Sequence, residues 1–169
     1  MVGLDGTGQG FYNLQQDVTW FGGFQSGMGL VYNGAGFGNT PTGIVVTFDG
    51  GNYGAGAYIQ TDWAGLFTAT ETLYDSSFQV IGTYTTTGIS NYNDPGTTLF
   101  IGMLDSNPEV FAAEFWATSN QTGYPSFAIG TLGIRTTPYA PGIPEPETFL
   151  LLGPALVGMG MLKRRLAHR

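Results

Sequence analysis

The side chains able to act as nucleophiles, bases or metal ligands leave few catalytic combinations in this chain. The only histidine is His168, near the C-terminal end, and there is no cysteine. A Ser-His-Asp triad, a Cys-His pair and a zinc site built on histidine or cysteine are therefore excluded from the rest of the chain. Catalysis by a pair of carboxylates is still possible, as in glycoside hydrolysis, which uses two carboxyl groups about 5 to 9 Å apart.

Glu71 and Glu114 are the carboxylate pair to consider. In GLFTATETLYD (65–75), Glu71 has the same parity as Phe67 and Leu73, which directs it toward the core side of a strand. Glu114 lies in a segment whose secondary structure is ambiguous. The simpler interpretation places these acids at an edge of the fold with solvent-facing head groups. We predict that the chain is not an enzyme, and a secreted carbohydrate-active enzyme is the alternative.

Two loops and one tryptophan are candidates for ligand binding. FDGGN and SNYNDPG offer oxygen atoms to calcium, although turn propensity explains their residues equally well. Trp63 lies in TDWAG, a predicted turn, where it could stack on a sugar ring, although packing is its simpler role. We predict no cofactor, and the weak calcium candidates are Asp49, Asn52, Asn91, Asn93 and Asp94.

Charge is distributed unevenly along the chain. Residues 1–148 hold all 12 acidic residues and a single base, Arg135, whereas residues 149–169 hold four bases and no acid. Phosphate binding requires clustered lysine and arginine, so the acidic part is not expected to bind nucleic acid. Charged residues make up only 10% of the chain, and 28 glycines accompany many Thr, Asn and Ser residues, which suits a secreted β-protein.

Apolar residues alternate with polar ones in a series of short runs, which predicts strands. DGGN (49–52) predicts a hairpin turn between the first two runs, and DSS (75–77) predicts a turn between the third and the fourth. Six or more such strands predict an all-β fold, an antiparallel β-sandwich or jelly roll. The runs are 43–50, 52–60, 65–75, 78–88, 97–104 and 126–135, with 18–21 and 29–32 as possible edge strands.

Residues 106–120 could form either a helix or a strand. Asn107 and Pro108 suit a helix start, whereas Phe111, Ala113 and Phe115 alternate as in a strand, which we favour. The chain then divides into four parts. These are an irregular N-terminal part of the β domain (1–42), the sandwich core (43–135), a proline-rich spacer (136–147) and an apolar C-terminal segment with a basic tip (148–169).

The C-terminal segment has the character of a short transmembrane helix. Fourteen uncharged residues follow the proline spacer and end at a basic cluster, and as a helix they would span about 21 Å. Basic residues after an apolar helix stay cytoplasmic, which would place the acidic part outside. The predicted span is Phe149, Leu150, Leu151, Leu152, Gly153, Pro154, Ala155, Leu156, Val157, Gly158, Met159, Gly160, Met161 and Leu162, and the stop-transfer cluster is Lys163, Arg164 and Arg165.

IPEPETFLLLGPALVGMGMLKRR (143–165) resembles the PEP-CTERM sorting signal of Gram-negative, exopolysaccharide-producing bacteria. The resemblance implies that Pro144, Glu145 and Pro146, followed by Thr148, form the motif recognised by exosortase, a membrane protease. It also implies a transient anchor in the bilayer. The start of the chain shows no signal peptide, although a sorting signal of this kind implies export. We therefore expect either that the sequence begins after the signal peptide or that its start codon was assigned downstream of the true one.

The preceding part, about residues 43–135, more loosely resembles the β-sandwich of PEP-CTERM surface proteins. Gly130 stands where the closing Phe-x-Ile-Asp-x-Leu motif of that sandwich has Asp. The two resemblances imply an exported, non-enzymatic protein of the cell surface or extracellular matrix. It would be held in the inner membrane until exosortase cleaves it, and its role would be adhesive or weakly polysaccharide-binding. A plain C-terminally anchored periplasmic protein is a further alternative.

Overall fold

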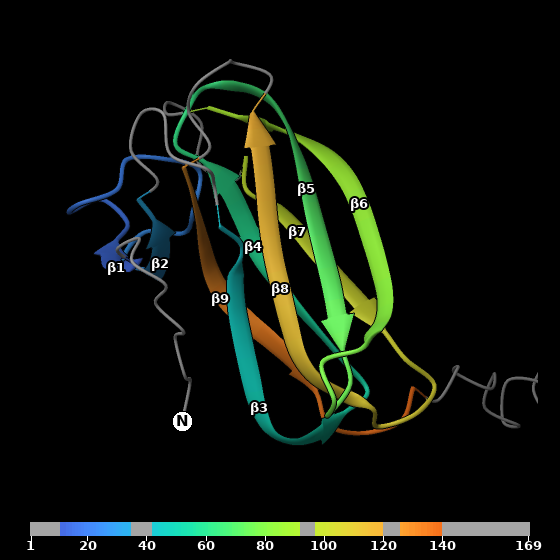
Figure 1. Ribbon diagram of the computed structural model, residues 1–169. Coiled ribbons are helices and arrows are strands. Elements are labelled where there is room, and N and C mark those ends of the chain that lie inside the picture. The colour runs from blue at the N-terminus through green and yellow to red at the C-terminus, as the bar shows by residue number, and fades with distance from the viewer. Residues whose placement is uncertain (1–10, 35–41, 92–96, 120–125, 140–169) are drawn as a thin grey trace, which may run out of the picture. The chain divides into compact units, whose positions relative to one another are not determined.

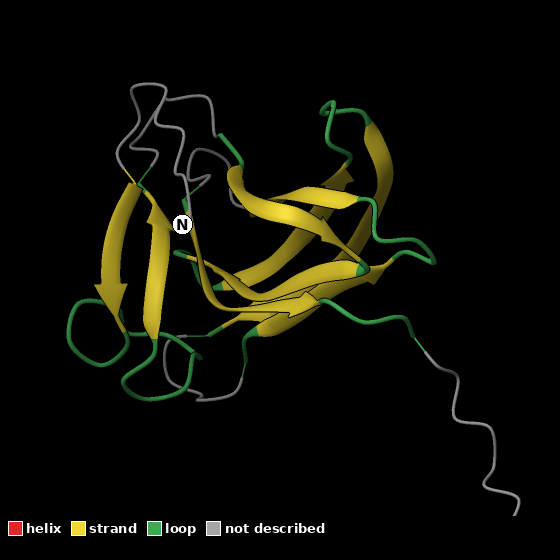
Figure 2. Cartoon of the chain, turned by 90° about the horizontal axis from the view of Figure 1, so that it is seen from below, coloured by secondary structure: helices red, strands yellow, loops and turns green. Residues whose placement is uncertain are grey.

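The structure, a computed structural model, describes residues 11–34, 42–91, 97–119 and 126–139. The predicted sorting motif, transmembrane segment and basic cluster lie outside these residues. The chain divides into two units, Met1–Pro138 and Tyr139–Arg169, and the fold described below belongs to the first. None of the described residues is helical (Figure 2), so they contain no helix that could span a membrane.

In the described part of the chain, nine strands form two antiparallel sheets that face each other, which confirms the predicted all-β sandwich (Figure 1). The five-stranded sheet has the order β1-β2-β9-β4-β7, and the four-stranded sheet has the order β3-β8-β5-β6. The strands are β1 (Phe11–Gln15), β2 (Gly29–Asn33), β3 (Ile44–Asn52), β4 (Gly54–Thr61), β5 (Gly65–Tyr74), β6 (Val80–Ser90), β7 (Leu99–Leu104), β8 (Val110–Ser119) and β9 (Phe127–Arg135).

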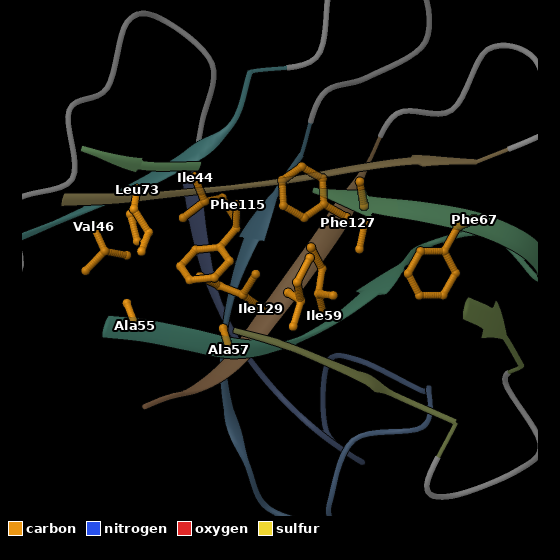
Figure 3. Packing of buried hydrophobic residues seen from close by; sticks show 14 of the residues in the cluster. Ile44, Val46, Ala55, Ala57, Ile59, Phe67, Leu73, Phe115, Phe127 and Ile129 are labelled. Carbon is orange, nitrogen blue, oxygen red and sulfur yellow. The ribbon is translucent and has the colours of Figure 1, made fainter. Parts of the chain in front are cut away.

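The core between the sheets pairs large aromatic residues with alanine. Phe67, Phe115 and Phe127 are fully buried, and Ala57 and Ala113 are among the small residues of the same cluster. Figure 3 shows side chains from both layers converging on this space. Alternation of large and small side chains lets two facing sheets interdigitate without voids.

Of the ambiguous residues 106–120, residues 110–119 form strand β8, which confirms the strand interpretation over the helix for that stretch. Strand β8 lies between β3 and β5, and its register pairs Phe115 with Ile44 and with Glu71. Pairing with both neighbours satisfies the backbone groups in the middle of β8, which overrides the helix-start signal of Asn107 and Pro108. The predicted turn at residues 75–77 is also confirmed, because β5 and β6 form a hairpin there.

The hairpin predicted at residues 49–52 is wrong. Strand β3 continues to Asn52 and pairs with β8, whereas β4 pairs with β7 and β9 in the other sheet. The register of β3 against β8 shifts between Thr47 and Asn52, so the Asp-Gly-Gly residues form a bulge at the point where the chain passes between sheets. Aspartate and glycine suit a bulge as well as a turn, so their presence did not distinguish the two.

The N-terminal part contributes strands that extend the five-stranded sheet. Residues 29–32 fall in β2, as expected, but residues 18–21 form a turn and β1 precedes them at Phe11–Gln15. The residues after β1 fold over the outer face of the sheet, where Trp20, Phe24 and Leu30 form a second buried cluster against Ala128. This cluster fixes the loop that forms one end of the groove described next.

Candidate binding groove

The outer face of the five-stranded sheet carries a row of glycines where other sheets carry side chains. Gly56 of β4 is paired with Gly102 of β7 on one side and with Gly133 of β9 on the other. A Cβ atom added to Gly133 would meet no atom nearer than 3.7 Å, so the sheet is open there. The glycine row therefore forms the floor of a hollow of about 380 Å³, bordered by Phe100, Leu104, Ile134 and Arg135.

Two exposed aromatic rings lie at one end of this floor. Tyr58 and Phe100 are directly opposite each other on β4 and β7, and their ring centroids are 5.3 Å apart in an edge-to-face arrangement. The residues are 38% and 52% exposed. The Phe100 ring lies over the glycine row, because a Cβ on Gly56 would come within 2.7 Å of the Phe100 Cζ. The Phe100 ring can take this position only because residue 56 is a glycine.

A second hollow, of about 530 Å³, lies on the other side of the ring pair. Tyr58 lines it together with Phe24, Thr98 and Thr131. Strands β4 and β9 each contribute to both hollows, whereas β7 lines the first hollow and Thr98, just before β7, lines the second. The two hollows thus lie on either side of the ring pair on the same face of the sheet, and we call the hollows and the ring pair together the outer groove.

A bulge and a buried glutamine shape this second half. The register of β9 against β4 shifts between Ala57 and Tyr58, which leaves Thr131 as an extra residue at the rim. Gln60, fully buried on the outer face, accepts hydrogen bonds at Oε1 from the Gly23 amide (2.9 Å) and Trp20 Nε1 (3.4 Å). The Gln60 side chain thus anchors the loop that forms one wall of the groove.

The chemistry of the outer groove is that of a binding surface. Its described lining consists of glycine, aromatic, aliphatic and small polar residues with Arg135 at one end, and contains no carboxylate. The Arg135 guanidinium donates hydrogen bonds to the backbone oxygens of Thr137 (3.0 Å) and Pro138 (3.1 Å). Exposed rings above a flat floor suit stacking against the apolar faces of sugar rings, and each hollow is within the usual size of ligand sites.

Sequence reasoning missed Tyr58 and Phe100, although a signal was present. Both are out of phase with the apolar core residues of their strands, and their neighbours of the same parity include Gly56 and Gly102. An aromatic residue that follows or precedes a glycine on the same face of a strand has no side chain to pack against on that side. That pattern indicates an exposed ring.

The predicted carboxylate pair is not formed, because Glu71 and Glu114 lie on opposite faces of the four-stranded sheet. Glu71 pairs with Phe115 and points into the core, whereas Glu114 pairs with Thr72 and accepts a hydrogen bond from the Tyr74 hydroxyl (2.6 Å). Glu71 is 0% exposed, and both of its carboxylate oxygens lack a hydrogen-bond partner among the described residues. Burial raises its pKa to about 8. The inward direction of Glu71 was predicted correctly, and its expected edge position was wrong.

The other predicted residues lie apart from the outer groove. Trp63 is 41% exposed in a turn after β4, as expected, and does not line either hollow. Asp49 is exposed, whereas Asn52 is buried and its side-chain amide donates to the backbone oxygens of Gly50 (2.8 Å) and Val110 (3.4 Å). The backbone oxygen of Asn91 accepts a hydrogen bond from the Thr97 hydroxyl.

Asn93 and Asp94 lie outside the described residues, so the second calcium loop is described only at its first residue. Among the described residues, no group of three or more Asp, Glu or His side chains could hold a metal ion.

No protein-family profile matches the chain, and no curated protein matches it at a significant level. Its fold is similar to that of a DUF4465 family protein from Bacteroides caccae (TM-score 0.43, 14% identity, 64% of this chain and 62% of that chain). It is also similar to the CBM22-1–GH10 modules of a Clostridium thermocellum endo-1,4-β-D-xylanase 10B complexed with xylohexaose (TM-score 0.38, 12% identity, 81% and 27%). A third likeness is to the enzymatically active domain of bacteriophage CBA120 tailspike protein 4 (TM-score 0.34, 15% identity, 79% and 19%). The chain thus spans less than two thirds of the length of each of these three.

Proposed function

We propose that this chain is an exported, non-enzymatic protein of the cell surface or extracellular matrix that binds polysaccharide in the outer groove. The observation that carries the binding proposal is the exposed Tyr58–Phe100 ring pair above the glycine floor. A hollow lies on each side of the pair, which suits an elongated chain better than a single compact ligand. The absence of a carboxylate among the described lining residues supports binding without hydrolysis.

The proposed delivery route rests on the C-terminal sequence. Pro144-Glu145-Pro146, the apolar run 149–162 and the cluster 163–165 occur in the order of a PEP-CTERM signal. We propose that this segment anchors the protein in the inner membrane, with the sandwich outside the cytoplasm, until exosortase processes it. The sandwich then remains at the surface or in the exopolysaccharide.

Binding is tested with the full chain on a glycan array, followed by calorimetry with the best polysaccharide. Replacing Phe100 or Tyr58 by alanine should cost about 1 to 2 kcal/mol, which is roughly a five- to thirtyfold rise in Kd. Phe78→Ala is the matched control, because Phe78 is an even more exposed aromatic residue that lines neither hollow. Binding that survives both groove variants but is lost in Trp63→Ala would refute the groove and support the site predicted from the sequence.

The enzyme alternative is tested in the same samples by assaying for released reducing ends. We expect none. Hydrolysis that disappears in Glu71→Gln or Glu114→Gln would contradict the non-enzymatic proposal.

Processing is tested by expressing the chain, with a signal peptide added, in an exosortase-positive host and in its exosortase deletion. The intact mass of the mature protein should lack the C-terminal segment only in the positive host. Replacing Pro144, Glu145 and Pro146 by alanine should abolish the difference. A tail that stays intact in both hosts would make residues 149–162 a plain anchor and overturn the sorting proposal.

A further inference from the structure

Strand β6 is a long, open edge of its sheet, whereas the other edge strands have features that discourage pairing with another strand. Among the described strands it pairs only with β5, and it lies at the outside of the four-stranded sheet (Figure 1). Its eleven residues, VIGTYTTTGIS, include no charge and no proline, and its only irregularity is a register shift near Val80. The other edges are blunted, since β1 and β7 are short and β3 contains a bulge with Asp49.

Exposed apolar side chains gather on and beside this edge. Val80, Tyr84 and Ile89 of β6 are exposed, as are Leu66, directly opposite Ile89 on β5, and Phe78 in the connecting turn. An uncharged strand bordered by apolar side chains attracts another strand, because pairing satisfies its free backbone groups and buries those side chains.

The composition of the strand favours a second copy of this chain as the partner. The chain as a whole carries a net charge of −7, so two copies repel each other except where they meet through uncharged surface. The outer face of β6 presents Thr83, Thr85 and Thr87, and two of these hydrogen-bond to threonines of β5: Thr85 with Thr70 (3.2 Å) and Thr83 with Thr72 (3.3 Å).

An antiparallel pairing of two β6 strands about a two-fold axis is self-complementary. With the axis at Thr85, each Thr83 would face Thr87 of the second copy, and each Gly82 would face Gly88. The threonine rows of β5 and β6 would then continue across both copies, with hydroxyl groups meeting hydroxyl groups. No large side chain would face another at the axis.

We infer that β6 is a homodimerisation edge, at which two copies pair antiparallel and join their four-stranded sheets into one. This inference is independent of the proposed function. It also leaves the outer groove free, because the groove lies on β4, β7 and β9 of the other sheet. A dimer would present two such grooves, and two grooves engaging one polymer would bind it more tightly than either alone.

Sedimentation of the full chain in mild detergent tests the inference. The double variant Thr85→Lys/Thr87→Lys places like charges against each other in the paired edge and should raise the dimer dissociation constant at least about tenfold. Thr70→Lys/Thr68→Lys is the matched control, because these two residues are the cross-strand partners of Thr85 and Thr87 on β5. It adds the same charges to the same face, one strand away from the edge, and should leave most of the dimer intact.

Cysteine crosslinking gives a second measurement that does not depend on the lysine variants folding. The chain has no native cysteine, so a single introduced thiol can pair only with its copy. Thr85→Cys should give a disulfide-linked dimer under mild oxidation, since residues opposite each other at a two-fold axis have Cβ atoms about 4.5 to 5.5 Å apart. Thr70→Cys should not. A monomeric wild type, or crosslinking at β6 no greater than in Thr70→Cys, would overturn the inference.

Discussion

The buried carboxyl group of Glu71 makes the stability of this protein depend on pH in a defined direction. Its ordinary pKa is 4.5, and burial raises the pKa in the folded state to about 8. Between these values the folded protein holds a proton that the unfolded chain releases, so the free energy of unfolding decreases as pH rises. The contribution is fully present below pH 4.5 and is lost as pH approaches 8.

The size of the effect follows from the shift. Each pKa unit corresponds to about 1.4 kcal/mol, so the loss between pH 4.5 and 8 is on the order of 5 kcal/mol, of which about 3 kcal/mol is lost by pH 7. Glu71→Gln keeps the shape and removes the titration. Glu71→Leu also removes the polar atoms, which lack a hydrogen-bond partner among the described residues, and should be the more stable variant.

The assay is urea unfolding of the wild type and both variants at several pH values from 4.5 to 8. The quantity of interest is the difference in unfolding free energy between wild type and Glu71→Gln. Burial also raises the pKa of Asp62, but both proteins contain Asp62, so its contribution to the pH dependence cancels in this difference. Glu114→Gln is the control for removing a carboxylate from the solvent side of the same sheet. A wild type-minus-Gln difference that stays constant over this pH range would refute the reasoning.

Two further predictions concern the outer groove. Gly133→Leu should block polysaccharide binding with little loss of stability, because no atom lies nearer than 3.7 Å to the added Cβ. Gly56→Ala should instead destabilise the fold, since its Cβ would lie 2.7 Å from Phe100 Cζ. Binding isotherms and melting temperatures check both variants, and a stable Gly56→Ala would contradict the described packing. Gln60→Ala removes the acceptor of the Gly23 amide and should cost about 1 to 3 kcal/mol and speed amide exchange at Gly23; unchanged exchange there would show that the glutamine does not hold the loop.

Local alternation determined much of the sandwich from the sequence. In β5 the buried set includes Phe67, Ala69 and Leu73, and the threonines between them face outward, as the parity of the residues predicts. Strand geometry alone fixes this, because successive side chains point to opposite faces. The inward direction of Glu71 followed from the same parity.

The sheet partners of the strands were decided only by the tertiary structure. Asp49, Gly50 and Gly51 have the local chemistry of a hairpin turn, yet β3 and β4 belong to different sheets. Which strand satisfies the backbone of β3 depends on packing against β8, which comes much later in the chain, and no local pattern encodes that pairing.

The outer groove likewise exists only in the folded chain. The sequence shows that Tyr58 and Phe100 are out of phase with the apolar residues that form the core of their strands, but not that the two rings meet. Their contact follows from the β4–β7 register, and the floor beneath them from the alignment of Gly56 with glycines of two neighbouring strands. Parity gives the direction of each side chain, whereas long-range register decides which side chains lie together, and here that register made the groove.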